Sequence, residues 1–186
     1  MTAVRLLVLG AVRRRGRAHG YQVRADLESW GAHEWARATS GSVYNALKSL
    51  TRDELLRVHG TAPSEAGGPP RMEYEVTAGG ERAYLELLRS ALARRDPRMD
   101  VLAAAVGFID DLSRTDAIAL LEERAGELDE WRASITTHLP PDTDLDTWGP
   151  VGEVIGLWLD TADSRAAWTR RLIGRLEDGA FRMADD

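Results

Sequence analysis

The chain has 186 residues, of which 44% are hydrophobic and 29% charged, a composition typical of a folded globular protein that excludes general disorder. It contains no cysteine, so disulfides, thiolate metal sites and cysteine nucleophiles are excluded. The net charge of −6 is unevenly divided: residues 1–95 carry 15 Lys and Arg against 10 Asp and Glu, whereas residues 96–186 carry 9 against 20. This division indicates a cationic part that suits a polyanion and an acidic part that does not, with chance variation between two surfaces as the alternative.

The apolar residues of the N-terminal half predict three short helices. The first covers residues 3–12 and ends at an Arg-rich stretch, and the second covers residues 20–30 and is closed by Gly31. The third begins at Ser40, which we expect to be its N-cap. Its inward face is formed by four apolar residues at helical spacing: Val43, Ala46, Leu47 and Leu50.

After the third helix the pattern changes from helical to extended. Residues 55–61 and 71–76 predict two strands, joined by a Pro/Gly-rich loop over residues 62–70. Three helices followed by a β-hairpin is the order of the winged helix-turn-helix, in which the third helix can enter a DNA major groove. Thr77 is expected to cap the next helix, which runs towards Pro97.

The C-terminal half predicts two long helices with apolar seams, the first capped by Ser113 and the second following a break at residues 138–147. The seams contain Ile118, Leu121, Ala125 and Leu128, and Val151, Ile155, Trp158 and Ala162. They offer more apolar surface than one helical hairpin can bury, so we expect them to pair across a two-fold axis.

The expected fold is therefore mainly α with a small β-hairpin. A winged helix-turn-helix DNA-binding domain is predicted over residues 1–95, including a linker helix over residues 77–95. A helical dimerisation region, which is also the candidate effector region, is predicted over residues 96–186.

The outward arc of the third helix carries side chains that suit DNA. They are hydrogen-bond donors, one amide and two cations, and no carboxylate occurs among them before Asp53. The residues predicted to bind DNA on this helix are Ser40, Ser42, Tyr44, Asn45, Lys48 and Arg52. Small residues at a helix N-terminus can approach phosphates, whereas Asn and Lys further along can reach phosphates or base edges. The alternative is a solvated helix face.

With these residues in view, the sequence resembles the PadR family of bacterial transcriptional regulators. The resemblance rests on Leu7–Leu9, His19-Gly20-Tyr21, the run from Ser40 to Leu50, Leu55–Leu56, and Pro70-Arg71 followed by Tyr74, Thr77 and Gly80. It covers about the first 90 residues, and the combination is more specific than any one piece. The C-terminal half is more loosely similar to the helical dimerisation region of the family.

The resemblance implies a homodimer that binds a roughly palindromic operator in double-stranded DNA, usually as a repressor, and that in many members is released by a small molecule. By the family pattern, Tyr21 would face DNA at the start of the second helix, together with residues of the third, and Arg71 would lie on the wing. Glu54 departs from the glycine usual in the turn after the recognition helix. Met72 and Glu73 depart from wing positions that are commonly basic or aromatic.

Two further groups of residues leave alternatives open. Arg13, Arg14, Arg15 and Arg17 suit DNA phosphates, but they equally suit the C-terminal end of a helix dipole. Of the tryptophans, Trp30 and Trp35 are expected in the core of the DNA-binding domain. The four in the acidic half can line a cavity for an apolar or aromatic effector, or simply pack between helices: Trp131, Trp148, Trp158 and Trp168.

Enzymatic interpretations find little support. The four histidines show no metal-ligand spacing, and there is no phosphate-binding loop or nucleophile elbow, so we expect no enzymatic activity, metal or cofactor. No segment approaches the ~20 apolar residues that span a bilayer, and the N-terminal charge pattern does not fit a signal peptide. We therefore expect a cytoplasmic protein without a membrane partner. A winged-helix protein–protein adaptor that binds no DNA is the alternative function.

Overall fold

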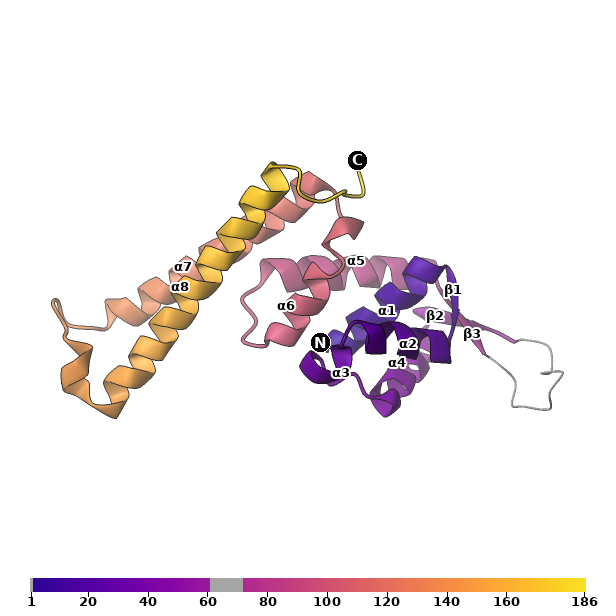
Figure 1. The fold of residues 1–186 in the computed structure, drawn as a ribbon, viewed down its shortest axis with the longest axis horizontal. Helices are drawn as coiled ribbons and strands as arrows, with labels where there is room; N and C mark the ends of the chain where they lie inside the picture. Colours follow the sequence, from indigo (N-terminus) through magenta and orange to yellow (C-terminus); the bar gives the residue numbers. More distant parts are fainter. Residues whose placement is uncertain (1, 61–71) are drawn as a thin grey trace. The chain divides into compact units, whose positions relative to one another are not determined.

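The structure is a computed structural model that describes residues 2–60 and 72–186 (Figure 1). Arg71, predicted on the wing, lies outside the described residues. The chain forms two compact units, the first from residues 1–91 and 96–108 and the second from residues 92–95 and 109–186. None of the helices in the described part of the chain is long and apolar enough to cross a membrane.

Helix α1 (Ala3–Arg15) forms the centre of the first unit. All residues from Leu6 to Val12 are buried, as expected of a helix that is apolar on every side. The helix is one turn longer than predicted, because Arg13–Arg15 continue it and their positive charges suit its carbonyl end. Gly16 ends it with a φ of 72°, a conformation that glycine adopts without steric cost.

Three further helices follow α1, and two of them were predicted. The additional one is a single turn, too short to show a period in the sequence. Thr39, not Ser40, is the N-cap of the third predicted helix, because its Oγ1 accepts a hydrogen bond from the backbone N–H of Ser42 at 3.3 Å. The helices are α2 (Gly20–Ser29), α3 (Ala32–Trp35) and α4 (Ser40–Arg52).

A three-stranded antiparallel sheet replaces the predicted two-stranded hairpin. Its order is β1-β3-β2, with Ala18 and Val58 opposite Tyr74 on either side of the central strand. The two expected strands are present, and the third, β1, has only three residues and no visible alternation. The strands are β1 (Arg17–His19), β2 (Leu56–His59) and β3 (Glu73–Val76). The fold class is confirmed: a mainly helical chain with a small sheet and a winged helix at its start.

Helix α5 (Ala78–Ala93) starts at the predicted cap. Thr77 Oγ1 accepts from the backbone N–H of Gly80 at 2.9 Å and donates to the carbonyl of Glu54 at 2.8 Å. A Cβ atom at Gly80 would lie 2.0 Å from the carbonyl oxygen of Leu55, so only glycine fits where α5 meets the start of the wing. Helix α6 (Met99–Val106) completes the first unit.

The expectation that Trp30 and Trp35 lie in the core is wrong. Each is 37% exposed, because α3 is a surface turn and holds Trp35 at its edge. Trp35 Nε1 donates to the carbonyl of Trp30 at 3.2 Å, and Trp30 meets the edge of Phe108 with ring centroids 5.8 Å apart. These three aromatic residues line a cavity of about 180 Å³ within the first unit.

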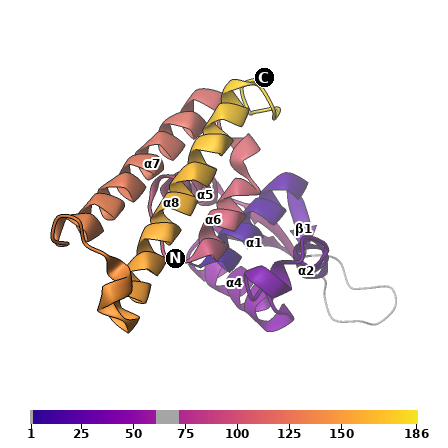
Figure 2. The same ribbon diagram turned by 60° about the vertical axis from the view of Figure 1, so that its left-hand side comes forward.

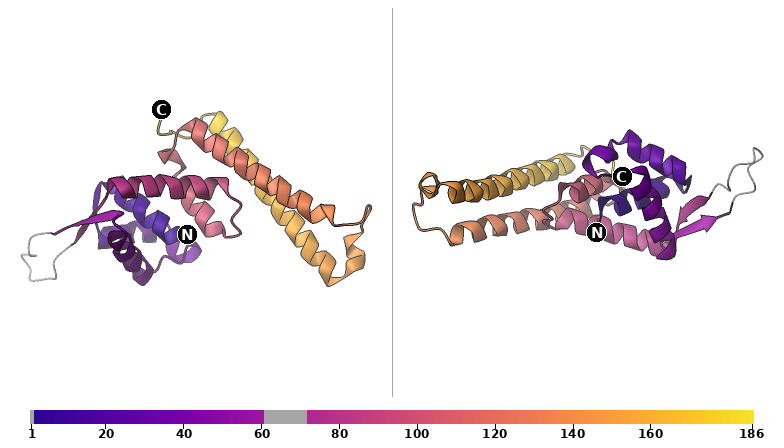
Figure 3. Two further views of the ribbon diagram at one scale, coloured as in Figure 1. Left: turned by 180° about the vertical axis from the view of Figure 1, so that it is seen from behind. Right: turned by 90° about the horizontal axis from the view of Figure 1, so that it is seen from below.

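The second unit is a hairpin of two long helices, α7 (Arg114–Thr137) and α8 (Pro150–Glu177), which lie side by side in Figures 2 and 3. Two single turns accompany them, η1 (Ile109–Asp111) and η2 (Leu145–Trp148). The predicted cap is confirmed, since Ser113 accepts from the N–H of Asp116 at 3.1 Å. Leu121, Ala125 and Leu128 of the α7 seam are buried in this unit, as are Ala162, Leu172 and Leu176 of α8.

Candidate nucleic-acid interface

The burial of α4 divides it into the two faces that the sequence predicts. Val43, Leu47 and Leu50 are fully buried, and Ala46 nearly so. The predicted DNA-binding residues on the other face are exposed, except for the half-buried Ser42: Ser40, Tyr44, Asn45, Lys48 and Arg52. Within residues 2–60 and 72–186, neither Asn45 nor Lys48 has a side-chain hydrogen bond or ion pair, so both can contact a ligand without breaking one.

Ser42 takes part in closing the first turn of α4. Its hydroxyl donates to the carbonyl of Thr39 at 2.9 Å and also lies 3.3 Å from the carbonyl of Arg37. Arg37 is an exposed cation with a φ of 53°, immediately before the helix begins. Arg37 was not among the predicted residues, because a single arginine in a short connection shows no periodic signal.

Tyr44 rests directly on the backbone of α2. A Cβ atom at Gly20 would lie 2.7 Å from Cε1 of Tyr44, so the absence of a side chain at Gly20 makes room for the ring. On either side of this glycine, the rings of His19 and Tyr21 stack with centroids 5.5 Å apart and planes inclined by 13°. Gln22 accepts from the backbone N–H of His19 at 2.8 Å and fixes the start of α2. The His19-Gly20-Tyr21 motif thus seats Tyr44 on the start of α2, at the residue that precedes Tyr21 in the chain.

Arg52 lies at the end of α4 in a shared ion pair. The carboxylate of Asp53 forms ion pairs with Arg52 at 3.1 Å and with Arg5 at 3.0 Å. The hydrogen bond from Arg5, followed by that from Arg52, lowers the pKa of this carboxyl group. Exposed ion pairs of this kind contribute only ~0–1 kcal/mol. Arg52 can therefore exchange Asp53 for a phosphate at little cost.

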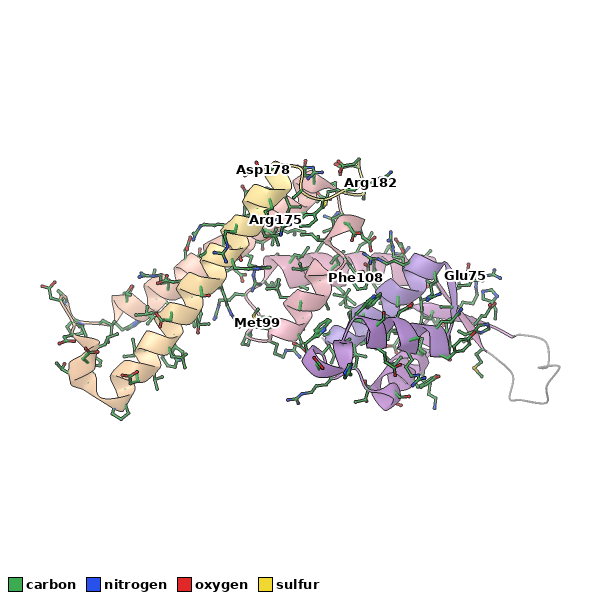
Figure 4. All side chains as sticks on the ribbon, in the orientation of Figure 1. Glu75, Met99, Phe108, Arg175, Asp178 and Arg182 are labelled. Carbon is green, nitrogen blue, oxygen red and sulfur yellow. The ribbon has the colours of Figure 1, made fainter. Side chains whose placement is uncertain are left out.

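Part of the positive charge on the outer face of the sheet is offset by one carboxylate. Glu75, labelled in Figure 4, lies on the central strand and meets Arg57 at 2.8 Å, His59 at 2.5 Å and Arg17 at 3.6 Å. The hydrogen bond from Arg57, followed by that from His59, lowers the pKa of Glu75 to about 2. Because the carboxylate of Glu75 pairs with both Arg17 and Arg57, the described part of the wing presents less free positive charge than its arginines suggest.

The three arginines in the last turn of α1 are engaged in contacts within the first unit. Arg13 pairs with Glu81 at 2.7 Å, and both Nε and Nη2 of Arg15 contact the carboxylate of Asp26 at 2.6 Å. Arg14 lies over the ring of Phe108, 4.6 Å from its centroid. These contacts, together with the place of the arginines in the last turn of α1, favour the structural interpretation over phosphate binding.

The tryptophans of the acidic half divide in two groups. Trp131, Trp148 and Trp158 line one cavity of about 460 Å³ in the second unit. Trp168 does not line this cavity and is half-buried on α8. The first three therefore remain candidates for an effector site, and the role of Trp168 stays an untested prediction.

Comparison with known proteins adds a family and several solved structures. Residues 8–86 match the model of the Transcriptional regulator PadR-like family, which confirms the resemblance seen in the sequence. A Streptococcus mutans UA159 protein of known structure is 19% identical, with a TM-score of 0.41 over 94% of this chain and 99% of its own. Bacillus subtilis PadR in complex with operator DNA is 18% identical, with a TM-score of 0.40 over 92% and 98% of the two chains. No curated protein matches the chain.

Proposed function

We propose that this chain, whose residues 8–86 match the model of the PadR-like family of transcriptional regulators, binds double-stranded DNA with α4 in the major groove. The observation that carries this proposal is the outward face of α4, where Asn45 and Lys48 are exposed and Tyr44 is seated on Gly20. An Asn side chain can form hydrogen bonds with adenine edges, and a Lys side chain can do so with guanine edges and phosphates. Because the Tyr44 ring is already held in place, it loses little side-chain entropy when DNA binds. Tyr21 contacts the backbone beside them in this arrangement.

We further propose that the protein is a repressor that binds a roughly palindromic operator as a homodimer. Residues 1–95 would supply DNA binding and residues 96–186 dimerisation. Support for a dimer comes from the first half of α8, where Val151 and Leu157 are 59% and 64% exposed. Val154 and Trp158 lie on the same stretch and are also exposed, so an apolar surface remains uncovered by α7. Burying that surface against a second copy would relate two α4 helices by a two-fold axis.

An effector that lowers operator affinity is the third part of the proposal. The cavity lined by Trp131, Trp148 and Trp158 offers an aromatic site in the region assigned to dimerisation. A ligand releases DNA only if it binds the DNA-incompetent arrangement more tightly, and couplings of this kind are typically ~1–3 kcal/mol. α5 links the two parts, since it begins at the wing and ends within the second unit.

The test of DNA binding uses an operator selected from random duplexes by the purified protein. Tyr44→Ala combined with Lys48→Ala should weaken binding to it by about ten-fold or more, since a base contact is worth ~1–3 kcal/mol. The loss of Lys48 should also reduce the slope of log affinity against log salt by ~0.9. Arg82→Ala is the matched control, because it removes an exposed cation from α5 and not from α4.

Two outcomes would contradict this proposal. If the double variant keeps its circular dichroism spectrum and its operator affinity, α4 does not contact the DNA. If the parent protein selects no duplex and shows no salt-dependent affinity, the protein–protein adaptor becomes the better interpretation.

Dimerisation is tested by sedimentation at micromolar concentration. Leu157→Glu should shift the protein towards monomer, because it places a charge in the apolar stretch of α8. Ala133→Glu adds the same charge at an exposed position of α7 outside that stretch and should leave the assembly unchanged. A parent protein that sediments as a monomer would refute both the dimer and the palindromic operator.

A further inference from the structure

We propose that the cavity between Trp131, Trp148 and Trp158 binds an organic cation with a poorly hydrated charge, such as a quaternary ammonium group. The inference rests on the effector site of the proposed function and names the class of ligand that this site takes. The cavity is built entirely from the second unit: Trp131 comes from α7, Trp148 from η2 and Trp158 from α8. Its volume of about 460 Å³ suits a small aromatic molecule.

The wall that carries Trp148 is fixed by two glycines. Gly149 has a φ of 57° and a ψ of −139°, which favours glycine, and it reverses the chain between η2 and α8. A Cβ atom at Gly152 would lie 2.0 Å from the carbonyl oxygen of Leu145, so η2 is pressed against the first turn of α8. The backbone that carries Trp148 is therefore held in place before any ligand arrives.

The segment that follows Trp131 and Arg132 supplies most of the cavity lining, is acidic and contains no Lys or Arg. Between residues 133 and 164 there are six carboxylates, namely Asp142, Asp144, Asp146, Glu153, Asp160 and Asp163. Only Asp163 has an ion-pair partner among the described residues, Arg132 at 2.6 Å. His138 is the single basic lining residue. A surface with this charge attracts cations and repels carboxylate ligands.

One of the three indoles already holds a cation within the same unit. The guanidinium carbon of Arg95 lies 4.4 Å from the ring centroid of Trp131. Indole faces attract cations through their quadrupole, and a quaternary ammonium loses less hydration than a lysine ammonium when it reaches them. Aromatic walls beside an acidic segment allow a protein to select such cations over neutral molecules of equal shape.

The experiment titrates benzyltrimethylammonium into the full-length protein and follows binding by calorimetry and tryptophan fluorescence. Neopentylbenzene, its neutral carbon isostere, and benzoate serve as comparison ligands. The cation should bind about two- to thirty-fold more tightly than the isostere, and benzoate more weakly than either. Trp158→Leu should remove most of this preference, whereas Trp35→Leu, a similarly exposed tryptophan of the first unit, should leave it unchanged. Glu153→Gln should weaken the binding of the cation and leave the binding of the isostere unchanged.

Two results would overturn the inference. Equal affinity for the cation and its isostere would make the cavity a purely apolar site. The second result is that no ligand binds the parent protein, which sediments as a dimer, whereas the Leu157→Glu variant does bind. This would show that a second copy of the chain covers the cavity. The DNA experiment distinguishes this inference from the proposed function. If the cation binds and the operator affinity is unchanged, only the effector role is refuted. If the operator binds and the cation does not, only the present inference is refuted.

Discussion

Replacing Glu54 by glycine should stabilise the first unit, although it removes an entire side chain. Glu54 has a φ of 59°, in the left-handed region, and connects α4 to the start of the wing. Its N–H donates to the carbonyl of Thr51 at 3.0 Å and its carbonyl accepts from Thr77, so the chain must keep this conformation. Its side chain is exposed and has no hydrogen bond or ion pair among the described residues.

The magnitude follows from two opposing terms. An L-residue in the left-handed region costs ~1–2 kcal/mol relative to the ordinary helical region. Glycine avoids this cost but gains conformational entropy in the unfolded chain, which offsets ~0.5–1 kcal/mol. The expected net effect of Glu54→Gly is an increase of about 0.5–1 kcal/mol in the free energy of unfolding.

The assay is urea unfolding monitored by circular dichroism, with midpoints compared at an unchanged denaturant slope. Glu86→Gly is the matched control: Glu86 is an exposed glutamate inside α5, where glycine should lower stability by ~1 kcal/mol. The two variants should therefore change stability in opposite directions. If Glu54→Gly is as destabilising as Glu86→Gly, the left-handed turn is not strained and the reasoning fails.

Two further predictions concern the wing and its junction with α5. Gly80→Ala should destabilise the protein by several-fold more than Gly79→Ala, because its Cβ would lie 2.0 Å from the Leu55 carbonyl oxygen whereas the nearest atom at Gly79 is 3.6 Å away; equal midpoints in urea would refute this. Glu75→Gln should lower stability at neutral pH, and the difference from the parent should shrink as the pH falls from about 4.5 towards 2. The sign follows from the pKa of Glu75, which Arg57 lowers to about 2, so the native state gains from the ionised form only above these values. A pH-independent difference in unfolding midpoint would contradict it.

Much of the first unit could be predicted because its elements carry strong local signals. The apolar face of α4 repeats at helical spacing, and the cap at Thr77 and the two wing strands follow from residue types alone. What could not be predicted depends on partners distant in the sequence. β1 is extended because it pairs with β3, and three residues such as Arg17–His19 have no pattern of their own.

The predicted site shows the same division. That Tyr44 is exposed follows from its place opposite the buried face, but that its ring lies on Gly20 depends on how α2 packs against α4. The sequence also shows that Trp35 is apolar and large, which favours burial, but not that α3 leaves it at the surface. Arg15 and its neighbours have charges that suit DNA, and only the fold reveals that Asp26 is close enough to take one of them.

The position of β1 at the edge of the sheet sets an order of events during synthesis. β1 precedes α4 in the chain, yet its partner β3 follows α4, so about 55 residues separate the strands that must pair. At ~5–20 residues per second, a ribosome needs roughly 3–11 s to make that interval. Helix α4 can therefore form while Arg17–His19 still lacks its partner strand, and the first unit closes only when β3 has emerged. The α7–α8 hairpin forms from neighbouring segments and needs no such wait, so the slowest folding step should lie in the first unit.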